Sequence, residues 1–119
     1  MKGKNIMVHN DFICKVMHNI LLSSGSDLQK LKQQFENSNG FFRKADNAGF
    51  EYVFTDISET FQINNVCKDY HLGTLTGHLN DTPDAVGFVL FIKSGYIDTL
   101  EGYCMAADNW PDNNFDIFF

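Results

Sequence analysis

The hydrophobic positions of the chain follow two different periods, and the change falls close to Gly49. Before this glycine, apolar side chains recur every three or four residues, which is the spacing of one face of an α-helix. After it, apolar and polar residues tend to alternate, which is typical of β-strands with one buried face. The sequence therefore predicts an N-terminal helical part and a C-terminal sheet.

Two helices joined by a tight turn are expected in the N-terminal part. Asn10 and Asp11 can cap the first helix, because a short polar side chain accepts a hydrogen bond from a free N–H group of the first turn. The Ser23–Gly25 stretch should end this helix, and Gly40 should end the second one. We therefore predict a helical hairpin over about residues 10–38. The residues expected on its apolar stripe are Phe12, Ile13, Val16, Met17, Ile20, Leu21, Leu28, Leu31 and Phe35, and those on the polar side of the second helix are Lys30, Lys32, Gln33, Gln34 and Glu36.

Five or six short segments in the C-terminal part predict strands of a mainly antiparallel sheet. The least polar segment, Val86–Ile92, should be a central strand with one face covered by helix. A turn at Ser94–Gly95 leads into the next strand. There Ile97 and Leu100 are three residues apart, not two, so a β-bulge near Asp98 is expected. The predicted strands are Phe50–Thr55, Glu59–Val66, His71–Asn80, Val86–Ile92, Tyr96–Tyr103 and a short one within Phe115–Phe119, with a loop at Asn80–Asp84.

These elements predict one α+β domain over residues 1–119, in which the helical hairpin packs on one face of a sheet formed by about residues 49–119. The length of 119 residues suits a single domain, and twelve Phe residues supply core volume. No stretch approaches the roughly 20 apolar residues of a membrane-spanning helix, and no signal-peptide pattern is present. The three cysteines, Cys14, Cys67 and Cys104, are widely spaced, which suits reduced thiols of the cytoplasm better than a disulfide framework.

The formal net charge of −6 is unevenly distributed along the chain. From Asp56 to Phe119 there are ten acidic and two basic residues, whereas the part before Asp56 has five acidic and seven basic residues. The two parts therefore carry about −8 and +2. A strongly acidic surface repels nucleic acid and attracts cationic partners, although acidity that serves only solubility is an equally good explanation.

Acidic and aromatic residues near the C-terminus are the strongest candidates for a binding site. They lack the Asp-x-Asp-x-Asp-Gly spacing of a calcium loop, so a basic protein is the better-suited ligand. Trp110 could anchor such an interface, or it could cover the core beside Pro111 while the acids form a solvated rim. The expected partner contacts are Asp81, Asp84, Asp98, Glu101, Asp108, Trp110 and Asp112, with no metal and no cofactor.

Two pairs of residues could instead support catalysis. His71 and His78 could act as acid and base, but a spacing of seven places them on opposite faces of a regular strand. Cys14 and His18 are four residues apart on a helix and could share a metal, although no further ligand motif accompanies them. We therefore expect no enzymatic activity. A small His- or metal-dependent hydrolase and a structural or ligand-binding α+β domain remain as alternatives.

Residues 87–111 resemble the C-terminal hairpin of small bacterial immunity proteins of contact-dependent growth inhibition and other polymorphic toxin systems. The features in common are the Phe88–Ile92 strand, the Ser94–Gly95 turn, the Leu100–Tyr103 run and the Trp110–Pro111 pair. The resemblance implies a cytoplasmic protein that binds the C-terminal domain of one toxin, commonly a basic nuclease. It implies neutralisation by occlusion without chemistry, and it carries over no catalytic residues. The sequence leaves the oligomeric state open, with a monomer favoured.

Overall fold

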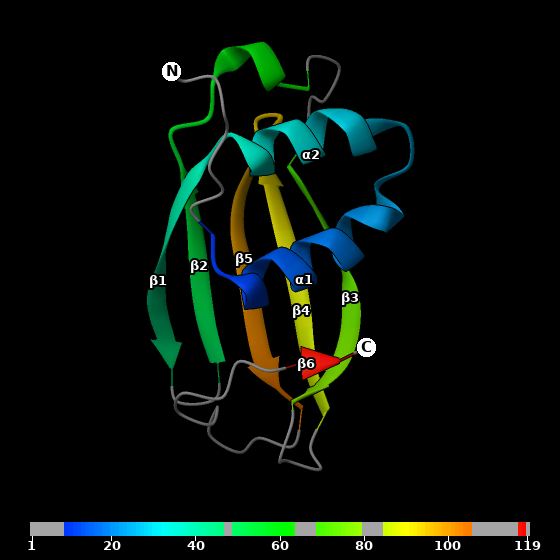
Figure 1. The fold of residues 1–119 in the computed structure, drawn as a ribbon, viewed down its shortest axis with the longest axis vertical. Coiled ribbons are helices and arrows are strands. Elements are labelled where there is room, and N and C mark those ends of the chain that lie inside the picture. Colours follow the sequence, from blue (N-terminus) through cyan, green and yellow to red (C-terminus); the bar gives the residue numbers. More distant parts are fainter. Residues whose placement is uncertain (1–8, 47–48, 64–68, 80–84, 106–116, 119) are drawn as a thin grey trace.

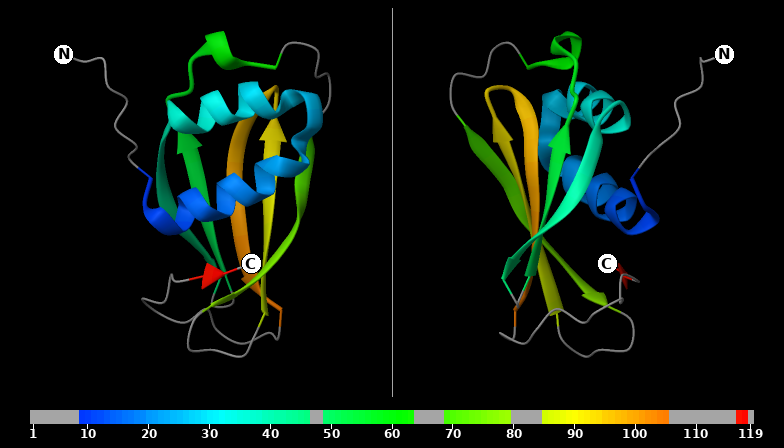
Figure 2. Two further views of the ribbon diagram at one scale, coloured as in Figure 1. Left: turned by 45° about the vertical axis from the view of Figure 1, so that its right-hand side comes forward. Right: turned by 90° about the vertical axis from the view of Figure 1, so that its left-hand side faces the viewer.

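The computed structural model describes residues 9–46, 49–63, 69–79, 85–105 and 117–118, and all structural statements below concern these residues. They form an α+β fold in which a helical layer packs on one face of a six-stranded antiparallel sheet, as the sequence predicted (Figure 1). Seen from its edge, the sheet has helices on one side only (Figure 2). The strand order is β1-β2-β5-β4-β3-β6. The helices are α1 (Asp11–Leu21) and α2 (Leu28–Glu36), with short 3-10 helices η1 (Leu22–Asp27) and η2 (Glu59–Phe61), and the strands are β1 (Asn39–Asp46), β2 (Gly49–Thr55), β3 (Tyr70–Leu79), β4 (Ala85–Lys93), β5 (Tyr96–Cys104) and β6 (Ile117–Phe118).

The helical layer differs from the predicted hairpin of two helices separated by a turn, because α1, η1 and α2 form one helical segment with a kink at Gly25. Asn10 caps its start as expected, since its side-chain oxygen accepts a hydrogen bond from the Ile13 N–H at 2.8 Å. α1 itself ends at Leu21, just before the Ser23–Gly25 stretch that was expected to end it, and the 3-10 helix η1 follows. The Ser23 and Ser24 hydroxyls donate to the carbonyls of Ile20 and Leu21, at 2.9 and 2.6 Å, and so satisfy the last carbonyls of α1.

Strand β1 was not predicted from the sequence, because Gly40 was expected to lie just beyond the end of a helix. In the structure Gly40 is paired with Phe54 across β1 and β2. The ring of Tyr52 occupies the space where a side chain at position 40 would lie. Glycine is therefore required here by the close approach of Tyr52 and not by the end of a helix.

The predicted strand Glu59–Val66 is also wrong over its described part. Residues Glu59–Phe61 form the 3-10 helix η2, and residues 64–66 lie outside the described residues. The Ser58 hydroxyl starts this turn by accepting a hydrogen bond from the Thr60 N–H at 3.2 Å. The hydrogen bond accepted by Ser58 therefore favours a short helical turn here, although the residues that follow alternate as in a strand.

The centre of the sheet agrees with the sequence analysis. Strands β4 and β5 lie in the middle, and the register shifts between Phe91 and Ile92, whose partners are Thr99 and Ile97. Asp98 is therefore the extra residue of the expected bulge. A second bulge, which was not expected, lies in β3, where the register shifts between Leu72 and Leu75.

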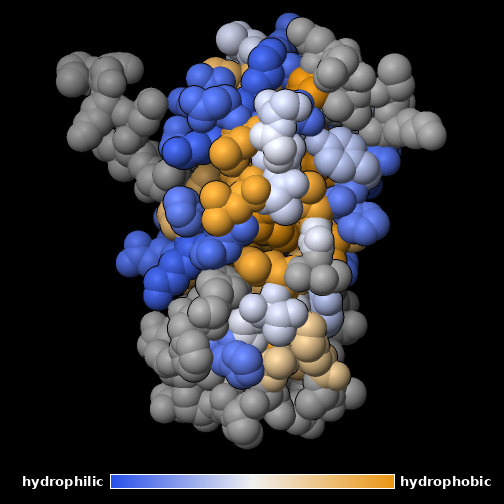
Figure 3. Space-filling model, turned by 90° about the vertical axis from the view of Figure 1, so that its right-hand side faces the viewer, coloured by the Kyte–Doolittle hydropathy of each residue, from blue (hydrophilic) through white to orange (hydrophobic). Residues whose placement is uncertain are grey.

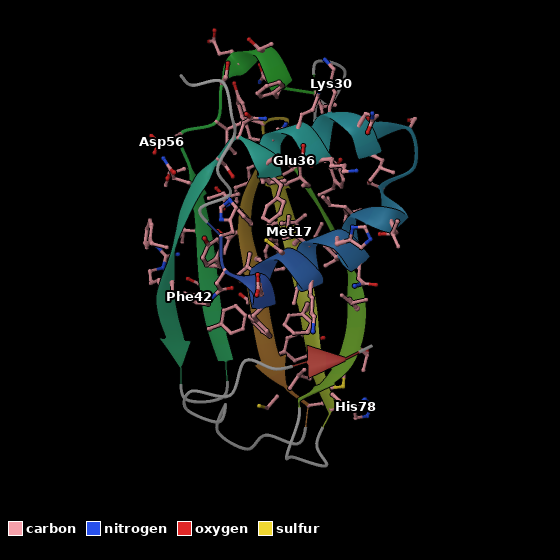
Figure 4. The ribbon with its side chains drawn as sticks, viewed as in Figure 1. Met17, Lys30, Glu36, Phe42, Asp56 and His78 are labelled. Carbon is pink, nitrogen blue, oxygen red and sulfur yellow. The ribbon has the colours of Figure 1, made fainter. Side chains whose placement is uncertain are left out.

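The core lies between the helical layer and the inner face of the sheet. Met17 of α1, which lies in front of the sheet (Figure 4), has no exposed surface, and neither do Phe88 and Leu100 of the sheet. Phe12 of α1 makes edge contacts with Phe50 and Phe88, whose ring centroids lie 5.8 and 6.0 Å away. The side of the molecule with the helical kink shows hydrophobic side chains in its middle, flanked by hydrophilic ones (Figure 3).

No helix in the described part of the chain is both long and apolar enough to cross a membrane. Of the cysteines that can be described, Cys14 is half-buried and Cys104 is buried, and both are free thiols. Cys67 and the predicted loop Asn80–Asp84 lie outside the described residues.

Candidate functional site

The face of the sheet that carries no helix is the candidate binding surface, and we call it the open face. The register identifies its members, because directly paired residues of antiparallel strands point to the same side. Glu101 of β5 pairs with Glu51 of β2 and Val89 of β4, and it alternates with the buried Leu100. The outward side chains of the three central strands β2, β5 and β4 include Glu51, Val53, Tyr96, Thr99, Glu101, Tyr103, Val89, Phe91 and Lys93, and the bulge residue Asp98 contacts Lys93 and Thr99 of this face.

The middle of the open face combines apolar contact area with two carboxylates. Val53, Val89 and Phe91 are partly buried without any helix over them. Glu51 and Glu101 lie directly opposite each other, which is unfavourable for like charges on neighbouring strands. Arg43 of β1 offsets part of this repulsion, because its guanidinium lies 2.6 Å from a Glu51 carboxylate oxygen.

Two of the predicted partner contacts, Asp98 and Glu101, lie on the open face. Asp98 is the bulge residue, and its carboxylate accepts a hydrogen bond from the Thr99 hydroxyl at 2.7 Å. The Lys93 ammonium lies 3.9 Å from the same oxygen, a distance at which an exposed ion pair contributes little to stability. The other five predicted contacts, Asp81, Asp84, Asp108, Trp110 and Asp112, lie outside the described residues.

Glu51 and Arg43 were missed by the sequence analysis, because β1 was not recognised as a strand. A signal for it exists in the Asn47–Gly49 stretch, which separates two segments rich in aromatic residues. Asn and Gly between two such segments are typical of a β-hairpin turn. Had the hairpin been assigned, Arg43 and Glu51 would have been placed as cross-strand neighbours.

The two histidines of β3 lie on the same face of the sheet, contrary to the expectation that they would lie on opposite faces. His71 pairs with Phe91 and His78 pairs with Ala85, and both partners point to the open side. The bulge between Leu72 and Leu75 adds a residue and so reverses the alternation. At about 3.3 Å per residue the histidines are still about 20 Å apart, too far to act on one bond.

Cys14 and His18 line a groove of about 460 Å³ between α1 and α2. Burial, with a further contribution from Asp11, raises the pKa of the Cys14 thiol, so the unreactive protonated form prevails at neutral pH. The thiol lies 3.7 Å from the His9 carbonyl oxygen, to which it donates a weak hydrogen bond. Within the described residues, no three His, Cys, Asp or Glu side chains are grouped so that they could hold a metal ion.

His9 is a buried histidine whose role the sequence did not indicate. Its Nδ1 lies 2.6 Å from the Tyr52 hydroxyl, and its Nε2 lies 3.2 Å from the Phe35 carbonyl oxygen and 3.1 Å from the Ser38 hydroxyl. Because a carbonyl can only accept, Nε2 carries the proton and Nδ1 accepts from Tyr52. Burial lowers the pKa of His9, although its contacts with Phe35 and Ser38 oppose this shift.

Because His9 is buried, the free energy of unfolding of the protein is expected to fall as the pH drops below 6.5. Because the pKa of His9 is lowered in the folded state, the unfolded chain binds more protons between that pKa and the ordinary value of 6.5. Replacing His9 by Gln should cost about 1–2 kcal/mol at pH 7.5 and should flatten this part of the pH dependence. Urea unfolding at pH 7.5 and 5.5 would measure both effects. His18→Gln is the matched control, since His18 is exposed on α1, and an equal flattening in both variants would contradict the assignment.

Comparisons with protein family models, with curated proteins and with solved structures find no match to this chain. The site is therefore interpreted from its own geometry. That geometry is a sheet face that none of the described helices covers and on which apolar, aromatic and acidic side chains are combined.

Proposed function

We propose that the protein is a non-enzymatic immunity protein that binds a cognate toxin domain with its open face and neutralises it by occlusion. The observation that carries this proposal is the position of Glu101, in the middle of a sheet face without helices and close to partly buried apolar side chains. The proposal also rests on the resemblance of residues 87–111 to such proteins. A cytoplasmic location belongs to the same proposal, because the toxin would act there.

The composition of the open face suits a cationic protein partner. Protein interfaces favour aromatic side chains at their centre, and Tyr96, Phe91 and Tyr103 lie here with part of their surface exposed. The carboxylates of Glu101 and Asp98 can pair with basic side chains at the edge of a nuclease cleft. The net charge of −6 would steer such a partner over longer distances and raise its association rate.

The hydrolase alternative receives less support. It would need His71 and His78 at the same bond, and the strand keeps them about 20 Å apart. It could instead use Cys14 with His18, but the raised pKa of the thiol opposes nucleophilic attack. An occluding surface needs neither pair.

The most direct test uses the C-terminal domain of a large secreted protein encoded beside this chain. The purified domain should bind the parent protein with nanomolar affinity and lose its toxic activity. Glu101→Lys is expected to weaken binding about 10- to 100-fold, because it places like charge against a basic surface. The association rate of the parent should fall as salt is raised, since screening shortens the reach of the charges.

Glu36→Lys provides the matched control, because it makes the same change in net charge on the helical side of the molecule. It should leave the affinity close to that of the parent. Equal effects of the two substitutions would show that the open face is not the docking surface. A parent protein that binds the domain without neutralising it would contradict the proposed function itself.

A further inference from the structure

Among the described residues, strand β1 forms a free edge of the sheet. Its neighbour in the described sheet is β2 on one side, and no other strand pairs with it. Phe41 and Phe42 are 50% and 43% exposed, although Phe side chains are usually buried. They point to opposite faces, because Phe41 pairs with Val53 and Phe42 pairs with the inward Tyr52. The edge is therefore apolar on both of its faces.

A free strand edge offers unpaired N–H and C=O groups to another strand. The regular part of β1 that could be extended runs over Asn39–Arg43, because the register shifts between Arg43 and Asp46. Five residues of regular backbone, with two exposed aromatic rings, form a template for one more antiparallel strand. The bulge after Arg43 limits the length of any such pairing.

The charges along this edge identify which strand suits it. Arg43, with 58% of its side chain exposed, lies at one end of the regular run. At the other end, the Asn39 amide donates a hydrogen bond at 2.8 Å to the carboxylate of Asp56, which is exposed (Figure 4). Arg43 is paired with Glu51, but its guanidinium has further N–H donors, so one end of the edge offers donors and the other end offers the Asp56 carboxylate. A second copy in antiparallel orientation brings the guanidinium end of each edge to the carboxylate end of its partner.

We propose that two copies of this protein associate by antiparallel pairing of their β1 strands, whereas the sequence left the oligomeric state open and favoured a monomer. A two-fold axis that passes through Phe41 perpendicular to the sheet keeps the helices of both copies on the same face of the joined sheet. In this register Phe41 faces Phe41 of the second copy, Phe42 lies opposite Gly40, and Arg43 lies opposite Asn39. An axis at Arg43 would instead place two guanidinium groups against each other, which disfavours that register.

The dimer goes beyond the proposed function and does not depend on it. It joins the two sheets edge to edge and leaves the middle of the open face uncovered, so a partner could still dock there. Pairing of five residues per copy buries less surface than the roughly 1,200 Å² of standard stable interfaces. The association is therefore expected in the micromolar range and should depend on concentration.

Sedimentation equilibrium of the whole chain tests the association. The parent should shift from monomer to dimer as its concentration rises. Phe41→Lys should weaken the dimer at least tenfold, because two ammonium groups would face each other across the axis. Leu22→Lys makes the same change at a side chain that is 63% exposed on the helical kink, and it should leave the dimer unchanged. A parent that stays monomeric up to millimolar concentration overturns the proposal, and so does equal weakening by both variants.

Oxidative cross-linking tests the register. Directly opposed residues of antiparallel strands have Cα atoms about 4.5–5.5 Å apart, which lies within the range that a disulfide can span. Phe41→Cys should therefore form a dimer linked through position 41, as shown by peptide mapping. Arg43→Cys should not link to itself, because Asn39 faces it. Linkage through position 43 and not through position 41 would overturn the proposed register.

Discussion

Replacing Gln34 by Leu is expected to lower the free energy of unfolding by about 3 kcal/mol. The Gln34 side chain has no exposed surface, and its amide nitrogen donates to the carbonyls of Phe61 and Gly95, both at 2.8 Å. Its oxygen accepts a hydrogen bond from the Ile97 N–H at 2.7 Å. Leucine fills a similar volume but leaves these buried backbone groups without a side-chain partner, and each such loss costs about 1–3 kcal/mol.

Chemical denaturation of the purified protein would measure this loss. A decrease of about 3 kcal/mol is large, because a domain of this size has about 5–15 kcal/mol of stability in total. Gln33→Leu is the matched control, since Gln33 is the exposed neighbour of Gln34 on α2, and its effect should stay within about 0.5 kcal/mol. Similar effects at the two positions would show that the hydrogen bonds of Gln34 contribute little.

Replacing Gly49 by Ala is also expected to be costly, by about 3 kcal/mol. Gly49 pairs with Tyr103 at the start of β2, and an added methyl group there would overlap the Gly102 carbonyl oxygen. The Gly102 carbonyl belongs to the backbone of the central strand β5, so it cannot move aside as the end of a flexible side chain could. Relief requires β2 and β5 to separate locally, which weakens their hydrogen bonds.

The loss can be followed by thermal or urea unfolding. Gly73→Ala serves as the control, because a methyl group at that strand position would come no closer than 3.3 Å to its nearest neighbour, a methyl group of Val89. That substitution should change stability by less than about 1 kcal/mol. If Gly49→Ala were tolerated equally well, the close approach of β2 to β5 would not limit stability.

The central hairpin could be predicted from the sequence because its signals are local. Val86–Ile92 is nearly free of polar residues, and Ser94 and Gly95 adopt positive φ angles of 53° and 83°, as a tight hairpin turn requires. The spacing of Ile97 and Leu100 correctly predicted the bulge at Asp98. Each of these features depends on residues that are close together in the chain.

The features that could not be predicted depend on contacts between distant parts of the chain. Gln34 was placed on the polar side of a helix, but it is buried because Gly95 and Ile97, more than 60 positions away, supply its hydrogen-bond partners. Strand β1 lacks an alternating pattern, because an edge strand exposes Phe41 and Phe42 on both faces. His9 is buried for the same kind of reason, since Tyr52 lies 43 positions away.

The candidate site was predicted only in part. Asp98 and Glu101 were correctly assigned to one hairpin, and the structure places both on the open face. Glu51 and Arg43 could not be added, because their position depends on the pairing of β1 with β2. The shared face of His71 and His78 follows from a bulge in β3 that no local pattern indicated.

β3 and β5, the two neighbours of β4, each contain a bulge. The number of residues in these strands therefore matters as much as their amino-acid composition. Removing Asp98 would allow regular pairing of β4 and β5 with Ile97 and Leu100 both still facing the core, because Ile97 and Thr99 already pair with the adjacent residues Ile92 and Phe91. One residue gained or lost in β5 away from this bulge would instead move every side chain on one side of the change to the other face. Related chains in the course of evolution could therefore replace amino acids along this strand freely on its outer side. Away from the bulge, they could not gain or lose a single position in this strand without rebuilding the interior.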